Sequence, residues 1–411
     1  ATPPCQGMST ANYKKADNEQ IRNSLVVQAI KLVSQIQPKI FIFENVRAFM
    51  KTICTDTDGN DKPISESIYS NLADRYNIFH RVINFKDYGV PSSRPRTIVI
   101  GTSKEFLNLS PLSLFPSRHK EIKLREAIGD LAPLDYGQRD KEDFLHFARQ
   151  FPIEQLEWIK NTKEGQSSFD QPLEFQPGHY DKHGNKVVNK GAYMGNKYRR
   201  LTWDKVCSCI HTRNDVLSSQ DTIHPSDNRV LSIRELMRVM TIPTTFHWTD
   251  YDDSVTIDNA DDYLKANELN IRRCIGEAVP TQIMRSVSSK VKLALDSTLQ
   301  NQADFFNEIK DLDVSKDIVR VKVKDIPALI GRVHQIAGLF GNKNKVELYC
   351  VDGSTETLKD LKKVLKDWDL ADFIKIISIT TNEVSKYSYQ LTLAEGKLTL
   401  CNSTQQLFLF D

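Results

Sequence analysis

The residue best suited to covalent chemistry is a cysteine close to the start of the chain, in the sequence Pro3-Pro4-Cys5-Gln6. A cysteine thiolate is a strong nucleophile. Each proline fixes its own backbone φ angle, so the pair holds the thiol at a defined turn. A lone cysteine is more often a small buried hydrophobic residue than a nucleophile, so other residues must decide between the two roles for Cys5.

Two later segments supply groups that could act on a substrate held near that thiol. Glu44, in the sequence F-E-N-V, ends a short apolar run, and Arg94 and Arg96 lie in Y-G-V-P-S-S-R-P-R over residues 88–96. A carboxyl group can carry or share a proton, and a guanidinium group can hold a carbonyl oxygen. The alternative is structural, because a strand-terminal salt bridge and a basic turn would contain the same residues.

Two further segments complete an ordered set: R-V-L-S-I-R-E at residues 229–235 and I-G-E-A-V-P at residues 275–280. Each segment is weak on its own, but the order and spacing of the whole set resemble those of the DNA cytosine-5 methyltransferase family. The resemblance covers roughly residues 1–295 and points to the bacterial restriction-modification type. We therefore expect a DNA (cytosine-5-)-methyltransferase.

The resemblance implies a role for each matched residue. Cys5 would add to carbon 6 of a cytosine that has left the base stack, which makes carbon 5 able to accept a methyl group from S-adenosylmethionine. Glu44 would contact ring nitrogen 3 and the exocyclic amine of the base. Arg96, with Arg94 beside it, would hold the carbonyl oxygen of the base and orient Glu44. The residues expected to contact the cofactor are Pro4, Asn45, Glu277 and Ala278.

Double-stranded DNA is the expected partner, and two regions could contact it. The first, residues 7–18, follows Cys5 and resembles the family's mobile catalytic loop. The second, residues 176–203, carries six Lys or Arg residues, a single acidic residue, four aromatic rings of Tyr and Trp, and four glycines. That mixture suits a nucleic-acid surface, but it also suits a solvated loop. The candidate DNA contacts are Gln6, Ser9, Lys14, Lys15, Lys182, Lys186, Lys190, Arg199 and Arg200.

The elements that must position these residues follow an α/β pattern, with apolar residues at helical spacing in some segments and short apolar runs in others. Alternating helices and buried strands favour a doubly wound, Rossmann-like methyltransferase sheet, whose ligands lie beyond the carboxyl ends of its strands. An acidic stretch at 250–262 indicates a surface loop. The predicted helices are 21–36, 64–76, 229–243 and 281–297, and the predicted strands are 39–44, 78–85 and 97–102.

The pattern changes near residue 300, where a small α/β module of unknown role is expected to begin. It alternates strand-like runs at 317–323, 345–351, 373–380 and 387–393 with helices at about 325–338 and 355–367. The expected division is a partial catalytic core over 1–104, a target-recognition region over 105–225, a return to the core over 226–299 and the accessory module over 300–411.

The sequence departs from the family in ways that keep other hypotheses open. The glycine-rich segment that begins the family's cofactor site is missing, so the Rossmann-like sheet is expected to be incomplete at the N-terminus. A complementary N-terminal segment or chain could complete it. Glu277 stands where the family usually has Asn, and Ser92 where it usually has Gln. The alternatives are a transfer-RNA cytosine-5 methyltransferase and a subunit of a split enzyme that is inactive without its partner.

Composition limits the remaining classes of protein. Apolar residues make up 40% of the chain and charged residues 26%, with 55 basic and 53 acidic side chains. These values are typical of a folded globular protein and exclude collagen-like, disordered and membrane-spanning chains. The seven cysteines include no C-x-x-C pair, which argues against a disulfide scaffold or a metal site and favours a reducing cytoplasm.

Overall fold

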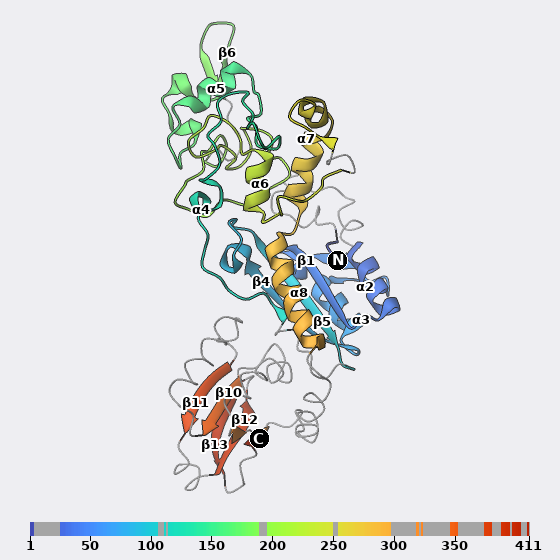
Figure 1. Cartoon of the computed structure of the whole chain (residues 1–411). Coiled ribbons are helices and arrows are strands. Elements are labelled where there is room, and N and C mark those ends of the chain that lie inside the picture. Colours follow the sequence, from blue (N-terminus) through green and yellow to red (C-terminus); the bar gives the residue numbers. More distant parts are fainter. Residues whose placement is uncertain are drawn as a thin grey trace. The chain divides into compact units, whose positions relative to one another are not determined.

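The computed structural model describes residues 1–3, 25–105, 111, 114–188, 195–249 and 254–296, together with strands of the C-terminal part (Figure 1). By packing, the chain divides into two units. Unit 1 comprises residues 1–83, 95–119 and 285–411, and unit 2 comprises residues 84–94 and 120–284. This division differs from the expected domain boundaries, because residues 226–284 pack within unit 2.

A mixed sheet forms the centre of unit 1. Its strands are β1 (Ile40–Val46), β4 (Tyr76–Asn84) and β5 (Pro95–Ser103), in the order β1-β5-β4. The pair β1–β5 is antiparallel, so the α/β sheet expected from the sequence includes one antiparallel pair. The connection before β5 spans only residues 85–94, which is shorter than the crossover a parallel neighbour needs.

The other edge of β1 carries the first residues of the chain. The amino group of Ala1 donates a hydrogen bond to the carbonyl oxygen of Ile42 at 2.6 Å, and the carbonyl oxygen of Ala1 accepts one from the backbone N–H of Glu44 at 3.1 Å. This alternation is the pattern of a parallel bridge. Residues 1–3 therefore run beside β1 and point toward its carboxyl end.

Helices cover the sheet where the spacing of apolar residues predicted them. Helix α2 (Leu25–Ile36) buries Val26, Val27, Ile30 and Val33, and α3 (Ile64–Leu72) buries one face in the same cluster. The predicted helix over 281–297 is α8 (Thr281–Asp296). The remaining described elements of this part are η1 (Phe49–Lys51) and the antiparallel hairpin of β2 (Ile53–Thr55) and β3 (Asp61–Pro63).

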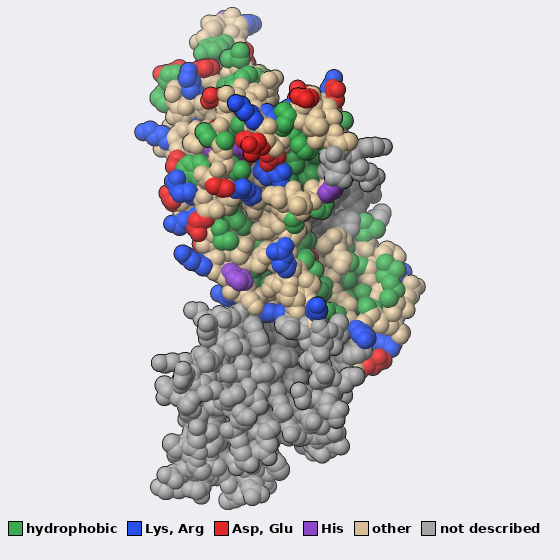
Figure 2. Space-filling model, viewed as in Figure 1, with side chains coloured by type: hydrophobic (Ala, Val, Ile, Leu, Met, Phe, Trp, Pro, Cys, Tyr) green, Lys and Arg blue, Asp and Glu red, His purple; other side chains and the backbone are tan. Residues whose placement is uncertain are grey.

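The outer face of α2 is apolar as well. Leu25, Leu32 and Ile36 lie on one side of this helix and are 45%, 53% and 71% exposed. Figure 2 shows hydrophobic side chains gathered over this helix. A helix that is apolar on both faces is usually covered on both, so this surface of unit 1 is a candidate contact site.

In the residues that the structure describes, unit 2 contains one long helix, several shorter ones, turns and a hairpin. The 18-residue helix α7 (Ala260–Glu277) was not predicted, because its first residues are acidic and read as a surface loop. Its buried positions, Leu264, Ile271 and Ile275 among them, are widely spaced. The other elements are η2 (Phe85–Tyr88), α4 (Leu124–Ile128), α5 (Ile153–Lys160), η4 (Ser168–Asp170), η5 (Leu173–Phe175), β6 (Gly178–Tyr180), β7 (Lys186–Val188) and α6 (Ile233–Val239).

The C-terminal part contains strands close to the predicted runs. Parallel pairing joins them in the order β11-β10-β9-β14, and an antiparallel sheet has the order β13-β12-β8. The expected helices at 325–338 and 355–367 lie outside the described residues. The strands are β8 (Ile318–Val319), β9 (Lys322–Val323), β10 (Val346–Val351), β11 (Ile374–Ile379), β12 (Ser388–Ala394), β13 (Lys397–Ser403) and β14 (Leu409–Phe410).

Within the described ranges, none of the helices combines the length and the apolar character that a bilayer crossing requires.

Candidate active site

The predicted carboxylate and guanidinium meet at the carboxyl end of β1. In the β1–β5 register Arg96 lies opposite Val46, so Glu44, two residues earlier in β1, is its diagonal neighbour on the same face of the sheet. Nε of Arg96 lies 3.2 Å from Oε1 of Glu44, and the two side chains are 16% and 11% exposed. A second nitrogen of Arg96 donates to the carbonyl oxygen of Pro95 at 2.9 Å. The guanidinium plane is therefore fixed against the carboxylate.

Two polar side chains hold the end of β1 in place. The hydroxyl of Thr97, which is fully buried, donates to the carbonyl oxygen of Val46 at 3.1 Å. Asn45 accepts a hydrogen bond from the backbone N–H of Val46 and donates one to the carbonyl oxygen of Pro3, each at 2.8 Å. Asn45 thereby ties residues 1–3 to the end of β1 beside Glu44. Thr97 was not identified from the sequence, although its place directly after R-P-R was a usable signal.

Several predicted site residues cannot be placed. The nucleophile candidate, its neighbours in the catalytic loop and one lysine of the basic region lie outside the described residues. They are Pro4, Cys5, Gln6, Ser9, Lys14, Lys15 and Lys190.

The second arginine of the 88–96 segment serves a different part of the fold. The guanidinium of Arg94 is 4% exposed and donates to the carbonyl oxygens of Ile210 at 2.6 Å and Gly276 at 3.0 Å, all within unit 2. Ser92 is fully buried and donates to the carbonyl oxygen of Ser208 at 3.1 Å. We expected Arg94 to act beside Arg96 on the cytosine base. This placement does not match that expectation, because Arg94 donates its hydrogen bonds to backbone segments of unit 2.

The R-V-L-S-I-R-E segment builds a buried charge network. Arg229 donates two hydrogen bonds to Glu235, at 2.7 and 2.9 Å, and two to Asp227, at 3.0 and 2.8 Å. Ser232 caps α6 by accepting a hydrogen bond from the backbone N–H of Glu235, whose carboxylate accepts one from the backbone N–H of Ser232. Burial alone would raise the pKa of Glu235, but the hydrogen bonds and charge of Arg229 lower it to about 2. This network is part of the interior.

Arg200 is also interior, although we expected it at a DNA surface. It is 4% exposed, and burial lowers its pKa to about 10. All five of its N–H donors are used, which leaves none for a phosphate oxygen. The acceptors are the carbonyl oxygens of Ile159, Thr162, His224 and Asp227 and the side-chain oxygen of Asn228. Its DNA-contact role is therefore corrected to a structural one.

The other charged candidates lie nearer the surface. Arg199 is half-buried and donates to the carbonyl oxygens of Gly165 and Gly195. Lys182 is exposed, and the ammonium of Lys186 lies 5.0 Å from the ring centre of Tyr180. Glu277, at the end of α7, is exposed, and the neighbouring Ala278 is half-buried.

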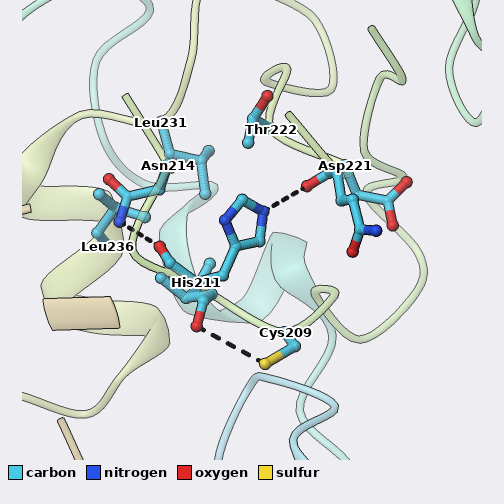
Figure 3. A pocket seen from close by; sticks show the side chains of 9 residues that line it. Cys209, His211, Asn214, Asp221, Thr222, Leu231 and Leu236 are labelled. Carbon is cyan, nitrogen blue, oxygen red and sulfur yellow. Dashed lines mark hydrogen bonds between the residues drawn. The ribbon is translucent and has the colours of Figure 1, made fainter. Parts of the chain in front are cut away.

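A pocket in unit 2 carries none of the predicted site residues. Figure 3 shows the imidazole of His211 in its centre, between Asn214 and Asp221. The ring nitrogen Nε2 of His211 lies 3.0 Å from the carbonyl oxygen of Gln220, and burial raises the pKa of Asp221. The pocket opens to solvent and is lined by Cys209, Ile210, His211, Asn214, Gln220, Asp221, Thr222, Leu231 and Leu236.

Comparison with known proteins agrees with the resemblance found in the sequence. The family described as C-5 cytosine-specific DNA methylase matches residues 1–293. The chain belongs to this family. As a C-5 cytosine-specific DNA methylase it is an enzyme that methylates DNA at cytosine carbon 5. The mixed helices and sheets of the structure are consistent with an α/β methyltransferase fold. The Type II methyltransferases among its relatives agree with the expected restriction-modification setting.

The relatives of this methylase include restriction-modification enzymes. It is 29% identical over 303 residues to the Type II methyltransferase M1.HgaI of Avibacterium volantium, covering 71% of this chain and 77% of the relative. It is 32% identical over 302 residues to the Type II methyltransferase M.FnuDI of Fusobacterium nucleatum, covering 71% and 75%. A crystal structure of a prophage-encoded DNA modification methyltransferase from Escherichia coli shares 20% identity, with a TM-score of 0.41 over 72% of this chain and 78% of that chain.

Replacing Glu235 with Gln should destabilise unit 2, because Arg229 is left buried with one charge partner fewer. Breaking a buried pair in this way typically costs about 3–5 kcal/mol. The folded-state pKa of Glu235 lies below its usual 4.5, so its stabilising contribution is present above pH 4.5 and is lost as the pH falls toward 2. The variant should therefore lose less stability between pH 5 and pH 3 than the wild type.

Denaturant unfolding at both pH values, followed by tryptophan fluorescence, measures this difference, since Trp158, Trp203 and Trp248 all belong to unit 2. Glu157→Gln is the matched control, because Glu157 is a solvent-exposed carboxylate whose side chain is 62% exposed. Equal pH dependence in wild type and Glu235→Gln would contradict the network.

Proposed function

We propose that the chain catalyses cytosine-5 methylation of double-stranded DNA with Cys5 as nucleophile and the Glu44–Arg96 pair as the site that binds the base. The observation that carries the proposal is the ion pair at the carboxyl end of β1, with Pro3 held beside it by Asn45. Cys5 follows Pro3 by two residues. The motif that carries the nucleophile thus continues directly from the residues that Asn45 ties to the end of β1.

The electron movements give each of these groups a task. The Cys5 thiolate forms a bond to carbon 6, the carbon 5–carbon 6 double bond opens, and its electrons move through the ring toward nitrogen 3. A proton shared with Glu44 at nitrogen 3 offsets the negative charge that develops there. Arg96 keeps the carboxyl group in one orientation and offers donors toward the carbonyl oxygen of the base. When a water molecule accepts the proton of carbon 5, the electrons of that bond re-form the carbon 5–carbon 6 double bond. The thiolate then leaves carbon 6 with the electrons of the carbon–sulfur bond, and the shared proton returns from nitrogen 3 to Glu44.

S-adenosylmethionine, the methyl donor of the family, supplies the electrophilic methyl group for carbon 5. The described residues do not by themselves fit this group. Both ends of the Asn45 amide are used within the protein, Glu277 is exposed, and the sequence lacks the family's glycine-rich segment. Asn45 therefore acts in this proposal through Pro3, and Glu277 and Ala278 are weaker candidates.

We propose that a further N-terminal segment, in the same polypeptide or in a partner chain, completes the cofactor site. Two features of unit 1 support such a contact. The backbone of Ala1 pairs with β1 at the edge of the sheet, and an edge of this kind can be extended by a further strand. The exposed Leu25, Leu32 and Ile36 give α2 an apolar outer face that such a segment could cover.

The nature of the substrate follows from the family. The matching family description names DNA, which does not favour a transfer-RNA substrate. A catalytically silent DNA-binding subunit is disfavoured by the Glu44–Arg96 pair, because a protein that only binds DNA has no need of it. Lys182 and Lys186 remain candidate DNA contacts at the surface of unit 2, and Arg199 could add one from its half-buried position.

The nucleophile is tested without relying on the cofactor. Addition of a thiolate to carbon 6 makes the carbon 5 proton exchangeable, so the chain should release tritium from DNA labelled at cytosine carbon 5. Cys5→Ala should reduce this release by about 10³-fold or more, while DNA binding is kept. Cys274→Ala, which removes a half-buried cysteine outside the motif, is the matched control. Full tritium release by Cys5→Ala would rule out this role.

The two arginines of the 88–96 segment should fail in different ways. Arg96→Lys keeps the charge but loses the planar donors, so tritium release should fall by about 10- to 100-fold with little change in the unfolding midpoint. Arg94→Lys should instead lower the midpoint, because buried carbonyl oxygens lose their donors. Paired activity and thermal unfolding measurements check this. Reduced activity of Arg94→Lys at an unchanged midpoint would return Arg94 to the active site.

If a further segment is needed to complete the cofactor site, this chain alone should bind S-adenosylmethionine weakly. Titration calorimetry of residues 1–411 with S-adenosylmethionine should give a dissociation constant far above the 1 μM–1 mM range usual for enzyme substrates. Adding the glycine-rich segment of a relative should restore binding. Tight binding by the 411-residue chain would contradict the need for a further segment.

A further inference from the structure

A two-stranded hairpin projects from unit 2 (Figure 1). Strands β6 and β7 pair antiparallel, with Gly178 opposite Val188, His179 opposite Val187 and Tyr180 opposite Lys186. Their burial patterns show no fully buried position. The hairpin therefore contributes little to a hydrophobic core. Its fold must be stabilised by interactions within the hairpin.

The turn of the hairpin is held by a single carboxylate. Oδ1 of Asp181 accepts hydrogen bonds from the backbone N–H groups of His183 at 2.8 Å and Asn185 at 2.9 Å. The carbonyl oxygen of Asp181 accepts one from Gly184, whose φ of +79° suits glycine. The hydrogen bonds to the carboxylate lower the pKa of Asp181, and the one from the backbone N–H of Asn185 has the largest effect among them. The residues between, Lys182 and His183, are thus presented from an ordered turn.

The strands approach each other closely at the base of the hairpin. A Cβ atom on Gly178 would lie 2.3 Å from the carbonyl oxygen of Val187, so glycine is required there. Near the tip, Lys186 lies over the ring of Tyr180 at 5.0 Å. Isolated hairpins are marginally stable, and these contacts compensate for the missing core.

Most of the exposed side chains of the hairpin are basic, aromatic or apolar, and the exposed amide of Asn185 is the further polar group. Lys182 and His183 are exposed at the tip, Tyr180 is 64% exposed and Val187 is 39% exposed. Asp181 is the acidic residue of the segment 178–188, and its carboxylate is already engaged within the turn. The tip therefore offers hydrogen-bond donors and positive charge, a combination that favours a polyanion or the acceptors of guanine.

We propose that the β6–β7 hairpin enters the major groove of the DNA substrate, where Lys182 and His183 read base edges and determine the methylated sequence. This inference rests on the proposed function. A two-stranded ribbon fits the width of the major groove, and an ordered turn fixes the backbone from which Lys182 and His183 project. Tyr180 and Val187 then present apolar surface along the ribbon, which suits contact with thymine methyl groups.

The test uses the 411-residue chain and a pool of duplex DNA with a randomised segment. Bound DNA is selected and sequenced, and affinity for the preferred site is then measured at several salt concentrations. The double variant Lys182→Ala/His183→Ala should change the preferred base at one or more positions and lower affinity for the wild-type site by about tenfold or more. The slope of affinity against salt should change little, because phosphate contacts, not base contacts, set it.

Two further variants separate the proposal from general effects. Lys163→Ala removes an exposed lysine of the same unit outside the hairpin and should keep the wild-type preference. Asp181→Ala keeps both reading side chains but releases the turn, so it should weaken the preference without replacing it by a new one. Circular dichroism and unfolding midpoints equal to those of the wild type show that each variant is folded.

Other outcomes overturn the proposal. An unchanged preference with a salt slope reduced by about one per lysine would make Lys182 a phosphate contact. Unchanged preference and affinity would place the hairpin outside the DNA interface, as expected if it binds another protein. Failure of the wild-type chain to bind DNA or to release tritium would instead contradict the proposed function, so the two failures are distinguishable.

Discussion

The ion pair between Glu44 and Arg96 depends on one strand register. Because side chains alternate between the faces of a sheet, a slip of one residue between β1 and β5 would move Arg96 to the face opposite Glu44. The register is fixed by a steric match: Phe41 lies opposite Gly101, where a Cβ atom would be 2.0 Å from the aromatic ring. The ring packs against Phe43 and Tyr76, so it cannot move aside. A hydrophobic contact at one end of the strands thus sets the polar pair at the other.

Adjacent residues of one motif can therefore have unrelated tasks. Arg96 lies in the first residues of β5 and contacts Glu44. Arg94 precedes β5 and donates hydrogen bonds to backbone carbonyl oxygens of unit 2. Both require arginine, since a guanidinium group can satisfy several acceptors at once. A sequence motif shows that both residue types are needed. It does not show that they act on the same atom.

The predictable parts of the fold were those governed by local periodicity. Helices α2 and α3 and strand β1 follow from the spacing of apolar residues, with bounds close to those expected. The direction of β5 depends on the length of the connection before it, which apolar periodicity does not reveal. Helix α7 has few buried apolar positions, such as Leu264 and Ile271, so its helical pattern was weak. The Glu44–Arg96 pair was predictable from the family resemblance. The interior place of Arg200 was not, because a basic sequence segment carries no information on which of its side chains turn inward.

Unit 2 illustrates why such inward arginines occur. A region built of turns has many buried backbone carbonyl groups that no helix or sheet satisfies, and Arg200 supplies donors to four of them. Arg229 and Arg272 also donate to backbone carbonyl oxygens, those of Val230 and Leu231. Their other donors bind the carboxylates of Glu235, Asp227 and Glu268. Buried guanidinium groups thus replace secondary structure as the framework of the loops. Lysine is a poor substitute there, because it has fewer donors and is strongly hydrated. The division of labour between interior arginines and a surface lysine such as Lys182 follows from that difference, and it leaves the exposed lysine available to bind DNA.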